Sequence, residues 1–276
     1  MKRAGVVLFP LILLAYVGLF LFQEKMVIKN LDQLTTLPSY RFFQAVSGYA
    51  RQLCAESIYI KTSVYLGGTH KQKTLKKNEK NLADHFVLVS KLHPKFRDTY
   101  FLCEGFLPSI SKESAARAND IIGTGQSTYP DFWLFDIFAA FNCFYYLDDH
   151  IKAASILNEA VQKPGAPSWL GRLASVLAAQ GGELYTGLNW LKLMRSGEKD
   201  DSARARYDKD IRVFEQAISV QQAADRYANH YGKPPEKLEE LVPEFLSEIP
   251  DPGKNFVYDW VPPTLKLKRP KTMGVR

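Results

Sequence analysis

Apolar residues recur at helical spacing along most of the chain, and the first clear pattern begins near Tyr40. Phe43, Val46, Ala50 and Leu53 follow one another at intervals of three or four residues, so they share one face of a helix. Proline at position 38 precedes this pattern and ends a polar connector. The sequence therefore predicts that the first helix after the connector starts close to Tyr40.

A second helix is predicted from Leu82 to Leu92, ending at His93 and Pro94. A loop around Gly67–Gly68 and the lysine-rich run that follows is expected to join the two helices. Together they would form an antiparallel hairpin.

Three prolines mark a repeat further along the chain. Pro94, Pro130 and Pro167 each stand two residues before Phe or Trp and open a new apolar helix, a position that proline tolerates well. They are 36 and 37 residues apart. Each interval contains a pair of predicted helices, in order 96–107 with 112–123 and 132–147 with 150–162, and a third pair covers 169–179 with 184–194. Two helices in each period predict an all-α solenoid, in which each hairpin buries its apolar face against its neighbours.

The last quarter of the chain departs from this repeat. Residues 202–231 predict one long helix, along which Tyr207, Ile211, Phe214 and Ile218 form a seam at spacings of four, three and four. Gly232 and the prolines after it end that helix. A short helix at 236–242 and two strands at 256–258 and 264–268 are expected to complete a small β-hairpin element.

The beginning of the sequence contains 19 residues without a charge, from Ala4 to Phe22, which is long enough to cross a bilayer as a helix. A cleaved signal peptide is the alternative, but the stretch 20–27 lacks the small residues that cleavage requires. Lys2 and Arg3 favour a cytoplasmic N-terminus. We therefore expect a single-pass protein of the inner (cytoplasmic) membrane whose bulk is periplasmic or otherwise extracytoplasmic.

These patterns divide the chain into five predicted parts. They are a cytoplasmic tail with a transmembrane anchor (1–25), a connector (26–39), helical repeats (40–197), a long helix (198–232) and a small C-terminal element (233–276).

Small residues at the predicted helix junctions resemble those of the tetratricopeptide repeat family. Ala139–Ala140, Ala153–Ala154 and Ala174, together with the boundary prolines, carry this resemblance. The run from Leu147 to Ala154, continued by Ala160, the stretch 164–169 and Leu173, also looks like a group of bacterial membrane-anchored repeat proteins of unassigned role. The resemblance spans roughly residues 47–259 and implies a location in the cell envelope.

The C-terminal element is similar to the head segment of type II secretion pseudopilins. The matching stretches are 230–235, 238–242, 249–252 and 256–259. The prepilin cleavage motif with its glutamate is absent from the N-terminal region, so assembly into a pilus-like fibre is not implied.

Composition and charge exclude few classes of protein. A hydrophobic fraction of 46% with 24% charged residues is typical of globular proteins. The net charge of +7 is clustered only at Lys71–Lys80 and in the tail from Lys266. We interpret the first cluster as a solvated loop, with contact to anionic lipid or an acidic protein as the alternative. No nucleic acid partner is expected outside the cytoplasm.

The three cysteines have none of the spacings that bind zinc or attach haem. Cys54, Cys103 and Cys143 are expected in the core, and one disulfide that leaves an odd thiol is the alternative. No metal site and no cofactor are predicted.

Candidate catalytic residues do not form a recognisable arrangement. No nucleophile or carboxylate accompanies the five histidines in a known motif. The segment Gly123–Thr128 lacks the lysine of a phosphate-binding loop and is interpreted as a turn between helices. The pairs Asp148–Asp149 and Asp200–Asp201 are expected to cap helices rather than to bind metal. No catalytic residue is assigned.

The tetratricopeptide resemblance implies that the first helix of each pair faces a concave groove for partner proteins. Counting from the opening prolines selects Asp98, Phe101, Leu134, Ile137 and Phe141. The aromatic residues of 132–146 are too numerous for one buried stripe, so some are expected to line this groove.

The sequence therefore predicts a membrane-anchored, extracytoplasmic scaffold that binds other envelope proteins in a secretion, pilus or transport assembly. Two alternatives remain open. One is a structural homo-oligomer that assembles through the long helix and the C-terminal element. The other is an enzyme whose site is scattered over the repeats.

Overall fold

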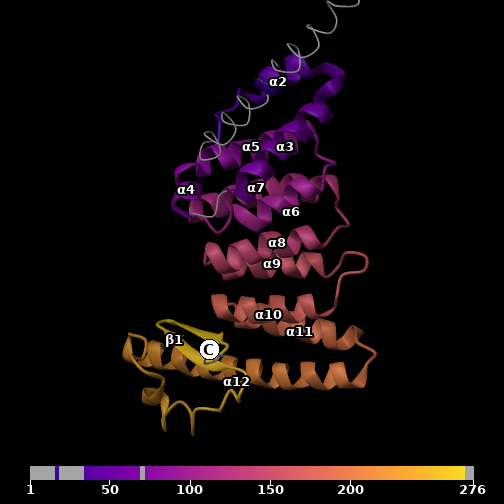
Figure 1. Cartoon of the computed structure of the whole chain (residues 1–276). Helices are drawn as coiled ribbons and strands as arrows, with labels where there is room; N and C mark the ends of the chain where they lie inside the picture. The colour runs from indigo at the N-terminus through magenta and orange to yellow at the C-terminus, as the bar shows by residue number, and fades with distance from the viewer. Residues whose placement is uncertain (1–15, 19–33, 69–71, 271–276) are drawn as a thin grey trace, which may run out of the picture. The chain divides into compact units, whose positions relative to one another are not determined.

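The computed structural model describes residues 16–18, 34–68 and 72–270 of the chain. These residues are mostly helical, with one two-stranded antiparallel sheet (Figure 1). The chain divides into two compact units at 128/129. The predicted combination of helices with a small C-terminal β-hairpin is confirmed at this level.

Residues 1–128 form the first unit. Its described elements are α2 (Tyr40–Ser47), the 3₁₀ turn η1 (Gly48–Ala50), α3 (Arg51–Gly68), α4 (Gln72–Lys77), α5 (Glu79–Leu92), α6 (Asp98–Phe106) and α7 (Lys112–Thr128). Helix α5 lies at the centre of the packing and contacts α3, α6 and α7. Its buried residues, among them Leu82, Phe86 and Val89, follow a helical stripe that supplies this core.

The first predicted apolar face packs against the core only through Phe43. Gly48 has a left-handed backbone (φ 45°), so the chain turns there and the helix divides into α2 and α3. Val46 is 63% exposed and Leu53 is 69% exposed. Residues including Ala55 and Ile58 face α5 instead. The expectation of one continuous helix was wrong because the periodicity could not reveal this break.

Two predicted loops of this unit are helical. The lysine-rich run forms α4 and the start of α5, apart from Lys71, which lies outside the described residues. Helix α7 continues through Thr128, so the stretch from Gly123 is not a turn. The hydroxyls of Ser127 and Thr128 donate to the carbonyls of Gly123 and Thr124, four residues earlier, as they do within helices.

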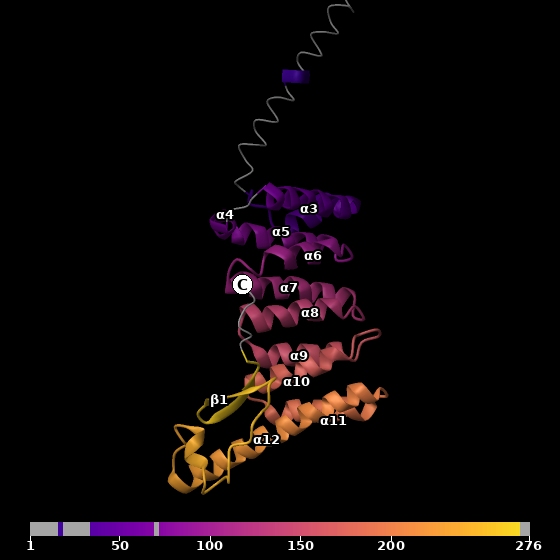
Figure 2. The ribbon, with the colours of Figure 1, turned by 60° about the horizontal axis from the view of Figure 1, so that its bottom comes forward.

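The second unit contains residues 129–276. Its described elements are α8 (Leu134–Phe141), the π-helical turn η2 (Asn142–Tyr146), α9 (His150–Ala160), α10 (Trp169–Gly181), α11 (Leu184–Gly197), α12 (Asp201–Tyr231), the 3₁₀ turn η3 (Leu238–Leu241), β1 (Val257–Val261) and β2 (Thr264–Lys268). From α8 to α12, each helix packs against the next one along the chain (Figures 1 and 2). The predicted helix positions in this unit agree with these elements within a few residues.

Two aspartates cap helices of this unit, as the sequence indicated. Asp149 accepts a hydrogen bond from the backbone N–H of Lys152 (3.0 Å) at the start of α9. Asp200 accepts from the N–H of Ala203 (2.7 Å) at the start of α12. Both carboxylates therefore satisfy backbone donors that a helix leaves unpaired.

The C-terminal element packs onto the helices. Strand β1 pairs with β2 in antiparallel register from Val257 opposite Lys268 to Val261 opposite Thr264. Strand β2 contacts α10 and α12 through its inward residues, and Leu265 and Leu267 are fully buried. The side chain of Gln221 in α12 accepts from the N–H of Leu265 (2.6 Å), which ties the hairpin to the long helix.

The predicted seam of the long helix lies inside this core. Tyr207, Phe214 and Ile218 are buried in one cluster with residues of α11 and of both strands, and Ile211 packs against the same cluster. The seam therefore serves folding within the unit.

The predicted membrane span 4–22 lies outside the described residues except for 16–18. None of the helices in the described part of the chain is both long enough and apolar enough to cross a bilayer.

Candidate interaction surface

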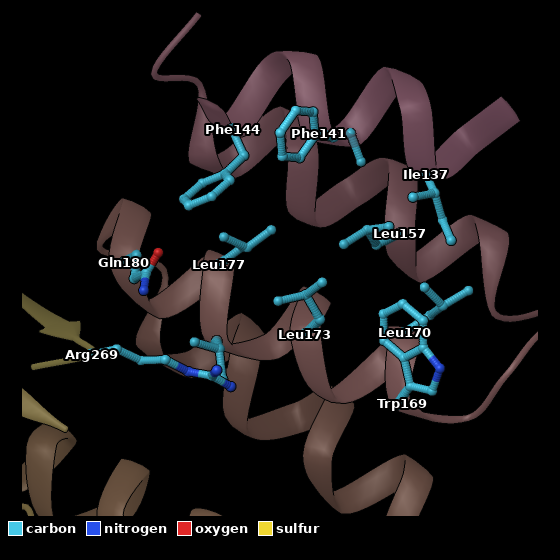
Figure 3. A pocket seen from close by; sticks show the side chains of 12 residues that line it. Ile137, Phe141, Phe144, Leu157, Trp169, Leu170, Leu173, Leu177, Gln180 and Arg269 are labelled. Carbon is cyan, nitrogen blue, oxygen red and sulfur yellow. The ribbon is translucent and has the colours of Figure 1, made fainter. Parts of the chain in front are cut away.

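An apolar cavity of about 270 Å³ opens in the second unit, between the α8–η2 segment, α9 and α10 (Figure 3). Its lining residues are Ile137, Ala140, Phe141, Phe144, Leu157, Trp169, Leu170, Leu173, Val176, Leu177, Gln180 and Arg269. Apart from Gln180 and Arg269, all of them are apolar. Such a surface binds apolar groups because it removes them from water.

The α8–η2 segment supplies one wall of the cavity. Ile137, Phe141 and Phe144 recur at spacings of four and three, so they face the same side of the helix (Figure 3). The helix ends in a π-helical turn, closed by a bond from the N–H of Leu147 to the carbonyl of Asn142 (3.0 Å).

Phe141 remains largely accessible at the edge of this wall. Its side chain is 45% exposed and stacks on the ring of Tyr145, with centroids 5.2 Å apart and planes 9° apart. This contact fixes the orientation of two aromatic rings without burying them. Both rings are thus available to a partner at low cost in side-chain entropy.

Helix α10 supplies the opposite wall. Trp169, Leu173 and Leu177 follow one helical face toward the cavity, and Trp169 is 53% exposed at its end (Figure 3). The other face of α10 is packed: a Cβ at Gly171 would collide with Met194 of α11. Helix α10 is therefore apolar on two sides: one packs against α11, and the other packs in one cluster with α8, η2 and α9 around the cavity.

Arg269 is the only charged residue among the described residues that line the cavity. It follows β2, and its side chain reaches the cavity below Leu173 and Leu177 (Figure 3). Arg269 also borders a neighbouring polar pocket of about 340 Å³, lined in addition by Arg172, Lys254, Asn255, Phe256 and Pro270. The two spaces thus share one guanidinium group.

The charges of the polar pocket are not all compensated. Arg172 donates to both carboxylate oxygens of Asp210, and this hydrogen bonding raises the pKa of Arg172. Within the described residues no ion pair involves Lys254 or Arg269. The junction between the apolar cavity and the polar pocket is therefore cationic.

The structure places the predicted groove residues in different units. Ile137 and Phe141 line the cavity, and Leu134 lies one turn earlier in α8 without contributing to it. Asp98 and Phe101 are exposed residues of α6, in the first unit. The choice of these five residues as one groove stays a prediction.

Sequence reasoning missed the α10 wall and Arg269. Trp169 was used only to mark the start of a predicted helix and in a family resemblance, although Trp169, Leu173, Leu177 and Gln180 recur at helical spacing. That spacing was a usable signal. No pattern in the sequence indicated Arg269, because only the folded β-hairpin brings it to α10.

Two of the three cysteines agree with the expectation of core thiols, and the disulfide alternative is not borne out. None of the three forms a disulfide; Cys103 and Cys143 are buried, and Cys54 is partly exposed. Burial raises the pKa of the Cys103 thiol well above its ordinary value, so it stays protonated. In the described part of the chain, no three His, Cys, Asp or Glu side chains gather as metal ligands do.

Comparison of the chain with protein-family models, with curated protein sequences and with solved structures gave no match.

Proposed function

We propose that this chain is a protein–protein interaction scaffold and that its docking surface is the cavity between α8–η2 and α10. The observation that carries the proposal is the pair Phe141 and Trp169, two half-exposed aromatic residues at the rim of an apolar cavity. Aromatic side chains next to apolar pockets are the usual anchors of protein interfaces. The docked partner is a peptide segment that inserts apolar side chains between the two helical walls.

The character of the cavity favours binding over catalysis. Its volume lies just below the roughly 300–1,000 Å³ of typical small-molecule sites, which suits a few side chains better than a large cofactor. Its walls offer no acid, thiol or imidazole among the described residues, so no group there can transfer a proton at neutral pH.

The proposal includes the tetratricopeptide-like architecture and the membrane anchor. Consecutive packing of α8, α9, α10, α11 and α12 supports a stack of helical hairpins. The uncharged stretch 4–22 would hold the chain in the inner membrane, with the helical units on the extracytoplasmic side. Other envelope proteins, such as components of a secretion, pilus or transport assembly, would then be the available partners.

A photo-crosslinking amino acid at position 169 of the full-length, membrane-embedded chain tests the docking surface. We expect crosslinks to another envelope protein, identified by mass spectrometry. Leu173→Asp should remove them, because it places a charge on an apolar wall. Leu193→Asp is the matched control, since Leu193 is exposed on α11 away from the cavity.

Crosslinks that persist in Leu173→Asp at the wild-type level would contradict the docking surface. Crosslinks only to a second copy of this chain would support the homo-oligomer instead. The buried seam of α12 makes pairing through that seam the weaker alternative. Protease protection in spheroplasts tests the orientation: full protection of the helical units from added protease would contradict the extracytoplasmic location.

A further inference from the structure

We propose that the segment bound at this surface carries a carboxylate beside its apolar anchor, so that the partner is recognised as an acidic–apolar peptide. This inference rests on the proposed docking function and adds the chemistry of the ligand. It starts from Arg269, which borders both the apolar cavity and the adjoining polar pocket. Arg269 would therefore lie next to both an apolar side chain bound in the cavity and a carboxylate bound in the polar pocket.

The charge of the junction decides the sign of the ligand. Arg172 is already neutralised by Asp210, whose carboxylate is 2.5 Å from Nε and 3.2 Å from Nη2 of Arg172. Lys254 and Arg269 have no acidic partner among the described residues. Two uncompensated cations in the polar pocket, one of which also borders the apolar cavity, attract an anion and repel a lysine or arginine.

A second basic pocket in the same unit shows the contrast. Lys266 and Lys268 border a pocket together with Asp148, Asp149 and His150. There Lys268 is also paired with Asp259 at 2.7 Å. The positive charge of that pocket is therefore balanced within the protein, whereas that of the Arg269 junction is not.

The proximity of the two spaces strengthens the expected contact. A guanidinium group can donate two parallel hydrogen bonds to one carboxylate, and such a pair is stronger where apolar side chains exclude water. Leu173, Leu177 and Arg269 line the same cavity (Figure 3). Docking of an apolar anchor against them would cover the ion pair on one side.

A peptide fits this surface better than a fatty acid does. Fatty acids and similar ligands are held in pockets that enclose roughly 70–90% of their surface. Here the rim residues Phe141 and Trp169 remain about half exposed, so the cavity is open along its edge. Broad aromatic faces at an open edge suit the side chains of a folded or extended segment.

Peptide display on the purified full-length chain in nanodiscs tests the inference. We expect the selected sequences to combine Leu, Phe or Trp with Asp, Glu or a terminal carboxylate. Binding of a synthetic selected peptide, measured by fluorescence polarisation, should weaken at least tenfold in Arg269→Glu. The same display on Arg269→Glu should select basic residues instead. Lys209→Glu, an equal charge change at an exposed site on α12, should leave binding within twofold of wild type.

The outcomes separate the two proposals. The inference would be overturned by peptides whose binding is lost in Leu173→Asp but unchanged in Arg269→Glu, and that show no preference for acidic residues. That result would leave the docking surface intact. If no peptide distinguishes wild type from Leu173→Asp, the docking surface itself fails. Binding of oleate that requires Arg269, with no peptide able to compete, would overturn the assignment to a peptide. Melting curves for each variant exclude unfolding as the cause of lost binding.

Discussion

Arg172 of α10 and Asp210 of α12 form a paired contact in which Nε and Nη2 of the guanidinium each donate to one carboxylate oxygen. The Asp210 side chain is 4% exposed, and the Arg172 side chain is 33% exposed. This contact joins two helices that are separated in sequence by α11. Arg172 directly precedes Leu173, which belongs to the cavity wall. The contact therefore helps to fix the rotation of α10 about its own axis, with Leu173 toward the cavity.

Removing the cation of this pair should destabilise the second unit. Arg172→Met leaves the buried carboxylate of Asp210 without its partner. Fully buried pairs lose about 3–5 kcal/mol in this way, and the partial exposure of Arg172 reduces the expected loss to about 2 kcal/mol. Urea denaturation measures the change.

The control is Arg195→Met, which removes the solvent-exposed pair of Arg195 with Asp208 between α11 and α12. Water already solvates both of those groups, so its effect should be clearly smaller. Equal losses in the two variants would show that burial of Asp210 does not matter.

Close packing of α11 against its neighbours should make Gly187 intolerant of a side chain. A Cβ there would lie 2.6 Å from Phe214 and 2.7 Å from the carbonyl oxygen of Ser175. Because a backbone oxygen cannot rotate away, we expect Gly187→Ala to lower stability by about 1–3 kcal/mol.

Gly197→Ala, in the same helix, is the matched control, since no atom lies within 4 Å of its added Cβ. Alanine there should be neutral or raise stability by up to about 1 kcal/mol, because it reduces the freedom of the unfolded chain. Thermal melts of the two variants provide the comparison. A neutral Gly187→Ala would refute the tight contact.

Acidification should destabilise the first unit through His85. Burial lowers the pKa of His85 below the usual 6.5, against the opposing effects of the Asn81 carbonyl and of Asp84, while Lys61 lowers it further. The unfolded chain then binds a proton that the folded chain excludes. The stability contributed by neutral His85 is therefore complete above pH 6.5 and declines as the pH falls from there toward the lower folded-state pKa.

Urea denaturation between pH 5 and pH 8 measures this effect. His85→Gln should show a shallower loss of stability on acidification than the wild type does. An unchanged slope in His85→Gln would mean that His85 is not held in its neutral form.

The thiols should react in a fixed order. Cys54 is partly exposed, whereas Cys103 and Cys143 are buried, and the raised pKa of Cys103 further suppresses its thiolate. We expect a thiol reagent to modify at most Cys54 in the native chain and all three cysteines after denaturation in guanidinium without reductant. Fewer than three reactive thiols in the denatured chain would reveal a disulfide. Mass spectrometry identifies the modified sites.

The helices were predictable because their signals are local. Apolar spacing located α5 to α12 within a few residues, apart from the end of α7, and Gly232 ends α12 with the left-handed backbone expected of a helix C-cap. The π-helical turn η2 carried no comparable signal, because both helix types place apolar residues at similar intervals. The division at Gly48 was missed for a similar reason: glycine permits a left-handed backbone but does not require it.

The sequence indicated only two of the residues that line the cavity. Ile137 and Phe141 were selected, and the excess of aromatic residues in 132–146 indicated that some would remain exposed. Which residues remain exposed depends on what covers each face, and spacing alone does not report this. Val46 and Leu53 are an example: their spacing places them on one face of a helix, but both side chains are exposed.

The sequence by itself determined where most helices begin and end, that an aspartate pair caps each of two helices and where the β-hairpin forms, because these features depend on neighbours within a few residues. Tertiary structure alone decided that Arg269 reaches α10, that Asp210 neutralises Arg172 and that Trp169 stays exposed. These relationships join segments that are far apart in the chain, and they arise only when packing selects which apolar faces meet. The charge and shape of the docking surface are therefore properties of the fold.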